Sequence, residues 1–85
     1  MCGIIGIVDK KNCINDLISS LSRLEYRGYD SAGIATLNKN KFVLNKSKGK
    51  LSNLRLKIKQ KKIMGNIGIG HTRWATHGKP SNDNA

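Results

Sequence analysis

The sequence predicts an α+β fold in which a few short strands are covered by two helices, and three features of the 85-residue chain indicate it. Short apolar runs bounded by polar residues are typical of strands. Two of these runs flank a short polar turn, which predicts a β-hairpin. Two other segments place apolar residues at helical spacing, and each needs a surface to cover. A sheet built from the strands would provide that surface.

The first half of the chain contains a strand, a helix and the hairpin. Residues 3–8 form a nearly continuous apolar run, which predicts a strand buried on both faces. Asn12 supplies a side-chain oxygen for an N-cap, and the helix is expected to continue up to Gly28. Its apolar stripe consists of Ile14, Leu17, Ile18, Leu21 and Leu24. Residues 33–37 and 41–46 are the two strands of the hairpin.

The second half contains a weaker helix and another strand. Apolar residues at i, i+3 and i+7 predict an amphipathic helix with a basic exposed side, and they are Leu51, Leu54 and Ile58. Residues 67–72 predict a strand, in which Gly68 and Gly70 either weaken the strand or let another backbone approach closely. The chain after Trp74 is polar and has the composition of a loop.

The charge balance is strongly basic, with a formal net charge of +11 and no acidic residue from Ser31 to Asn82. Such a chain could bind phosphate backbones, so a small basic nucleic-acid-binding module is the alternative function. Ten of the twelve basic residues in this stretch are lysines, and no aromatic residue lies in 46–62 for base stacking. We therefore expect a solvated basic surface rather than a nucleic-acid partner.

Cysteine usage and hydropathy predict a cytoplasmic protein with no membrane partner. Cys2 and Cys13 do not form the disulfide framework of a small secreted domain, which favours a reducing compartment. The N-terminus lacks the pattern of a signal peptide, and no apolar run approaches a membrane-spanning length. His71 has no Cys, Asp or Glu at metal-ligand spacing, so no metal site is predicted.

Cys2 becomes the N-terminal residue if Met1 is removed, and it then carries a free α-amine beside its thiol. In N-terminal nucleophiles the terminal amine accepts the proton of the side chain that attacks. The alternative is a small buried residue at the start of a strand, which an isolated Met-Cys would favour.

Three strings of residues bear on this choice: Cys2-Gly-Ile-Ile-Gly, the decapeptide LEYRGYDSAG at 24–33, and HTRWATHG at 71–78. Together they resemble the glutaminase domain of the class II glutamine amidotransferases, and more narrowly its glutamine:fructose-6-phosphate aminotransferase (isomerizing) branch. The resemblance implies an incomplete N-terminal nucleophile hydrolase fold, an α/β/β/α sandwich. With so few strands, one side of the sheet is expected to expose apolar surface.

The resemblance also implies how the chain is organised. Residues 1–85 correspond to the first part of the glutaminase domain, and the sugar-isomerase domains are absent. The family's oxyanion-binding Asn-Gly pair and its acidic residue for the substrate α-amine would lie beyond Ala85. We therefore expect an N-terminal fragment that is inactive alone.

The site residues implied by the resemblance come from two of the strings. Cys2 would be the catalytic nucleophile, and Arg73 would bind the substrate α-carboxylate, which suits a planar guanidinium. Trp74, Thr76 and His77 would line the substrate pocket. The plain alternatives are a surface arginine, a core tryptophan, a turn hydroxyl and a solvated imidazole, respectively.

The implied substrate is glutamine, which the family hydrolyses to glutamate and ammonia without a cofactor. A full-length enzyme would pass the ammonia to fructose 6-phosphate to make glucosamine 6-phosphate. For this chain, the implied partner is a polypeptide that carries the missing half of the site.

Overall fold

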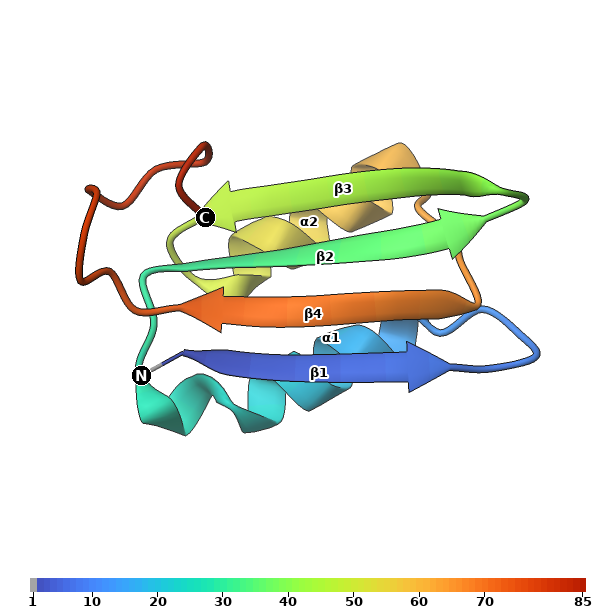
Figure 1. The fold of residues 1–85 in the computed structure, drawn as a ribbon, viewed down its shortest axis with the longest axis horizontal. Coiled ribbons are helices and arrows are strands. Elements are labelled where there is room, and N and C mark those ends of the chain that lie inside the picture. The colour runs from blue at the N-terminus through green and yellow to red at the C-terminus, as the bar shows by residue number, and fades with distance from the viewer. Residues whose placement is uncertain (1) are drawn as a thin grey trace.

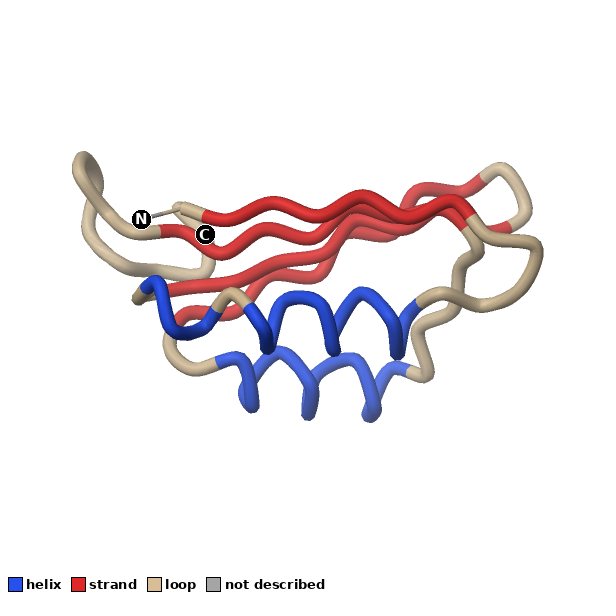
Figure 2. The backbone as a smooth tube through the Cα atoms, turned by 90° about the horizontal axis from the view of Figure 1, so that it is seen from below, coloured by secondary structure: helices blue, strands red, loops and turns tan. Residues whose placement is uncertain are grey.

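The computed structural model describes residues 2–85, which form a four-stranded antiparallel sheet with two helices on one of its faces (Figures 1 and 2). The strands are β1 (Gly3–Val8), β2 (Ser31–Asn38), β3 (Lys41–Lys48) and β4 (Ile67–Arg73), in the order β1-β4-β2-β3. The helices are α1 (Ile14–Arg23) and α2 (Leu51–Lys61), with a 3₁₀ turn, η1, at Glu25–Arg27. The predicted α+β class is confirmed.

The predicted hairpin is confirmed as β2 and β3. The turn between them consists of Lys39 and Asn40, whose φ angles are 49° and 63°. Two consecutive residues with positive φ match the right-handed twist of the flanking strands, and asparagine tolerates this conformation. The two strands are paired from Ser31 opposite Lys48 to Asn38 opposite Lys41.

Helix α1 begins one residue later than predicted, with Cys13 rather than Asn12 as its N-cap, and it is also shorter. The Asn12 Oδ1 atom accepts hydrogen bonds from the backbone N–H groups of Ile14 and Gly65, each at 3.2 Å. From the position before the N-cap, Asn12 therefore satisfies the first N–H of α1 and ties the start of the helix to the segment that enters β4. The helix ends at Arg23 rather than continuing to Gly28, because the backbone tightens into η1.

The core lies between the helices and the sheet. Helix α1 buries Ile14, Leu17, Ile18 and Leu21, and α2 buries Leu51, Leu54 and Ile58. These are the apolar stripes that the sequence predicts, apart from the half-buried Leu24. The strands contribute the buried Ala32 and Ile34.

Glycines in β4 allow α1 to lie close to the sheet. A Cβ atom added at Gly68 would lie 2.7 Å from Leu17 Cδ1, and one added at Gly70 would lie 3.1 Å from Leu21 Cδ1. Neighbouring strands are also close, because the added Cβ atom would lie 3.2 Å from the Ala35 carbonyl oxygen at Gly68 and 3.1 Å from Ile5 Cγ2 at Gly70. Glycine is used here for close packing across layers.

The second face of the sheet carries no helix or strand of the described residues (Figure 2). We call it the open face, and its large apolar residues are Ile4, Val8, Phe42, Leu44, Ile67 and Ile69, which are 38–83% exposed. The prediction that β1 is buried on both faces is wrong, because helices cover only one side of this edge strand. The prediction of an exposed apolar surface is confirmed.

Candidate functional site

The N-terminal cysteine and the segment after β4 meet at one end of the sheet. Strands β1 and β4 pair with Gly3 opposite Thr72, which brings Cys2 next to the residues that follow Arg73. The backbone N–H of Trp74 donates to Cys2 Sγ at 3.4 Å, and the same sulfur lies 4.0 Å from the Trp74 carbonyl oxygen. Cys2 is exposed and free. Its sulfur is therefore accessible to a substrate.

Trp74 packs over the loop that precedes β2. Gly28 has a φ of 81°, and a Cβ atom added there would lie 2.8 Å from Cζ3 of the Trp74 ring. Only glycine fits both this backbone conformation and this space. The ring is 51% exposed, so it is not a core anchor. The strings at 24–33 and 71–78 thus contact each other directly.

Arg73 is held inside the turn that follows β4. Its side chain is 14% exposed, and its Nη2 donates to the carbonyl oxygens of His77 and Gly78, the latter at 2.9 Å. Its Nη1 lies 3.8 Å from Asp30 Oδ1 and is buried without a hydrogen-bond partner among residues 2–85. The alternative of a plain surface arginine does not fit this burial.

Thr76 and His77 are both exposed at the tip of the same turn. His77 contacts Arg73 through its backbone carbonyl, not through its imidazole. The structure therefore brings Cys2 into contact with Trp74 at the end of β4, holds the Arg73 side chain in the turn that follows, and leaves the Thr76 and His77 side chains exposed.

Cys13 differs from Cys2 in its exposure to solvent. Its side chain is fully buried at the start of α1, and burial raises the pKa of its thiol above the usual value of 9.0. Because the thiolate is the nucleophile, Cys13 is inert at neutral pH. Among residues 2–85, no group of three His, Cys, Asp or Glu side chains is placed to hold a metal ion.

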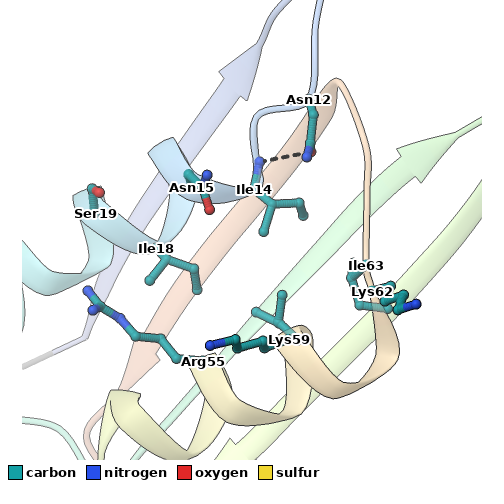
Figure 3. A pocket seen from close by; sticks show the side chains of 10 residues that line it. Asn12, Ile14, Asn15, Ile18, Ser19, Arg55, Lys59, Lys62 and Ile63 are labelled. Atoms are coloured by element: carbon teal, nitrogen blue, oxygen red, sulfur yellow. Dashed lines mark hydrogen bonds between the residues drawn. The ribbon is translucent and has the colours of Figure 1, made fainter.

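A separate cavity of about 480 Å³ lies between α1 and α2, on the helix side of the sheet (Figure 3). Its floor consists of Ile14, Ile18, Ile58 and Ile63, and its rim carries Arg55, Lys59 and Lys62. None of the predicted site residues lines it. The Arg55 guanidinium donates to Ser22 Oγ at 2.7 Å, so part of this rim already bridges the two helices.

The chain is similar in sequence to known aminotransferases. No protein-family model matches the chain. The chain is 59% identical over all 85 residues to the glutamine–fructose-6-phosphate aminotransferase (isomerizing) of Clostridium acetobutylicum and 54% identical to that of Thermosynechococcus vestitus. It is related over its whole length to the N-terminal part of these aminotransferases. The chain spans 14% of the length of either relative.

A solved structure supports the same relationship. The glutamine phosphoribosylpyrophosphate amidotransferase of B. subtilis, in complex with ADP and GMP, superposes with a TM-score of 0.77 and 26% identity, covering 91% of this chain and 17% of its own. The predicted resemblance to the amidotransferases and the N-terminal nucleophile hydrolase fold are thereby confirmed. The alternative of a nucleic-acid-binding module is not favoured. None of the described helices is both long and apolar enough to cross a membrane.

Two residues of the loop before β2 also have roles at this site. Gly28 makes room for the Trp74 ring, and Asp30 contacts both Arg73 and the turn behind it. Both lie in the string 24–33 that carries the resemblance to the amidotransferases. The resemblance in this string indicates that its residues matter, but the roles of Gly28 and Asp30 depend on contacts with a segment far away in the sequence.

Proposed function

We propose that this chain carries the nucleophile and part of the substrate pocket of a glutamine-hydrolysing site. The Cys2 sulfur attacks the side-chain amide carbon of glutamine, ammonia leaves, and a thioester forms; water then releases glutamate and restores the thiol. The observation that carries the proposal is the exposed Cys2 Sγ, 3.4 Å from the backbone nitrogen of Trp74, the residue that follows Arg73.

Proton transfer in this proposal involves the N-terminus. The α-amine of Cys2 accepts the thiol proton and later delivers a proton to the departing ammonia. This requires removal of Met1, a prediction that lies outside the described residues. The Trp74 N–H donates to the sulfur and so fixes the place of the nucleophile at the end of β4.

Substrate recognition is assigned to the turn after β4. Arg73 would bind the α-carboxylate of glutamine, since a carboxylate gives its buried Nη1 the acceptor that it lacks. The hydrogen bonds from Nη2 to His77 and Gly78 already fix the guanidinium plane. Trp74, Thr76 and His77 would line the pocket around the substrate.

The open face supports a second part of the proposal, a polypeptide partner that supplies the missing half of the site. A contiguous exposed apolar surface of this kind marks an interaction site. The partner would add the oxyanion donors, and losing one such donor typically costs about a hundredfold or more in rate. In a full-length enzyme the ammonia would be transferred to fructose 6-phosphate. The free thiols fit a cytoplasmic setting.

Covalent labelling tests the half-site without requiring turnover. We expect a diazoketone analogue of glutamine to modify Cys2, and the Arg73→Ala variant to lose this labelling while reacting normally with iodoacetamide. The buried Cys13 serves as an internal control. Equal labelling of wild type and Arg73→Ala by the analogue would refute the assignment of Arg73.

Glutamine hydrolysis tests the partner. The purified chain alone is expected to show no glutaminase activity, and addition of the segment that follows the aligned region in a related aminotransferase is expected to restore it. Intact-mass measurement establishes whether Met1 is removed. Retention of Met1, or turnover by the chain alone, would contradict the mechanism as stated.

A further inference from the structure

Asp30 stands at the junction of four segments around the candidate site. It lies directly before β2, and its carboxylate and backbone bond to residues from β2, from β4 and from the turns that follow β3 and β4. Its side chain is 21% exposed. Asp30 is therefore an acidic residue, in a chain of net charge +11, that links four segments to one another through its hydrogen bonds.

The backbone of Asp30 fixes the end of the sheet. Its N–H donates to the Arg73 carbonyl oxygen at 2.7 Å, and its own carbonyl oxygen accepts from the Gly49 N–H at 2.7 Å. The segment before β2 is therefore tied both to the end of β4 and to the turn before α2. These bonds do not depend on the identity of the side chain.

The carboxylate makes the contacts that do depend on it. Oδ2 accepts the backbone N–H of Ala75, and Oδ1 accepts the Ser31 hydroxyl at 3.1 Å. Oδ1 also lies 3.8 Å from Arg73 Nη1. The Asp30 side chain thus holds the turn after β4 through the Ala75 N–H, and it attracts the guanidinium of Arg73, which precedes that turn.

We propose that Asp30 is a positioning residue that holds Arg73 and the 74–76 segment in place beside Cys2. Asp30 does not touch the reacting sulfur. It sets the place of the Trp74 N–H, which bonds to Cys2 Sγ, by anchoring the next residue along the chain. It also aligns the guanidinium toward a substrate carboxylate. This second role rests on the function proposed above.

Two variants separate the backbone contact from the charge. Asp30→Ala removes both, whereas Asp30→Asn retains an oxygen that can accept from Ala75 and removes the attraction to Arg73. Asp83→Asn is the matched control, because it changes the net charge equally at an exposed position in the C-terminal loop. Urea midpoints establish that each variant is folded.

The first readout is hydrogen exchange of the Ala75 amide, followed by NMR on the full chain. Loss of a charge-assisted hydrogen bond predicts exchange at least about tenfold faster in Asp30→Ala. Asp30→Asn and Asp83→Asn are expected to keep most of the protection. Unchanged exchange in Asp30→Ala would overturn the anchoring role, whether or not the chain binds glutamine.

The second readout is the ratio of Cys2 labelling rates with the diazoketone analogue of glutamine and with iodoacetamide. A positioning role predicts that this ratio falls about tenfold in Asp30→Ala and about two- to fivefold in Asp30→Asn, where a partly exposed ion pair is lost. A merely structural role would change both rates equally and leave the ratio constant, which would overturn the alignment of Arg73. If wild type itself shows no preference for the analogue, the proposed function fails, and the Ala75 exchange still decides the anchoring role.

Discussion

Gly68→Ala tests the packing of α1 on the sheet. The added Cβ atom would lie 2.7 Å from Leu17 Cδ1, 3.0 Å from Thr36 Cγ2 and 3.2 Å from the Ala35 carbonyl oxygen. Leu17 is fully buried and Thr36 is 1% exposed, so neither side chain has free space to move into. Overpacking of this kind costs about 1–3 kcal/mol of the free energy of unfolding. For a domain of this size, that is a large share of a total of about 4–13 kcal/mol.

The matched control is Gly6→Ala in the neighbouring strand. A Cβ atom at Gly6 would have Ile69 Cγ2 as its nearest neighbour at 3.9 Å, an ordinary contact on the open face. We expect this variant to be unchanged or more stable by about 0.4–1 kcal/mol, since alanine restricts the unfolded chain. Urea denaturation followed by circular dichroism measures both variants.

A double-mutant cycle with Leu17→Ala identifies the clash. Leu17→Ala alone should cost about 2–5 kcal/mol, because it leaves a cavity under the sheet. In the double variant the new methyl group occupies part of that cavity, so the combined loss should be smaller than the sum by at least about 1 kcal/mol. Additive losses, or a Gly68→Ala variant as stable as Gly6→Ala, would refute the packing described here.

Three further outcomes are expected. Iodoacetamide should modify Cys2 but not Cys13 under native conditions, because burial raises the pKa of the Cys13 thiol; peptide mass mapping that finds Cys13 modified before unfolding contradicts this. Tyr29→Phe should lower the free energy of unfolding by about 1–3 kcal/mol, since the Tyr29 hydroxyl donates to Glu25 and accepts from Leu51 N–H, each at 2.7 Å. Tyr26→Phe, at a position 86% exposed, is the control and should change stability by less than about 0.5 kcal/mol. The free energy of unfolding should be constant up to about pH 9 and fall at higher pH. Burial raises the pKa of Tyr29 above 10.0 and that of Cys13 above 9.0, so the unfolded chain releases these protons at a lower pH than the folded chain. Chemical denaturation that shows no decrease in the free energy of unfolding by about pH 11 would argue against this.

Local patterns predicted most of the secondary structure. The stripes of α1 and α2 follow from the helical period, and the hairpin follows from a polar turn that tolerates positive φ. The end of α1 was less predictable, because Leu24 continues the apolar period although the backbone has already left the helix. The spacing of apolar side chains shows which face of a helix is buried. It does not show where the backbone hydrogen bonds change from the α-helical to the 3₁₀ pattern.

Tertiary relationships were harder to predict. The apolar run of β1 could not show which of its faces would be covered, because that depends on where two later helices pack. The site residues Cys2 and Arg73 were predicted from resemblance, and the structure brings them to one end of the sheet. The role of Asp30 depends on a turn more than forty residues away, for which no local pattern exists.

The register of β4 connects the helix packing to the candidate site. Side chains alternate between the faces of a strand, so a slip by one residue would move Gly68 and Gly70 to the open face and turn Ile67 and Ile69 toward α1. Leu17 and Leu21 leave no space for isoleucine there, because even a single Cβ atom at the glycines would lie 2.7 Å and 3.1 Å from them. The same register sets Gly3 opposite Thr72 and so places Cys2 beside Trp74. The two glycines beneath α1 therefore determine the position of the nucleophile relative to Arg73, although neither glycine touches the site.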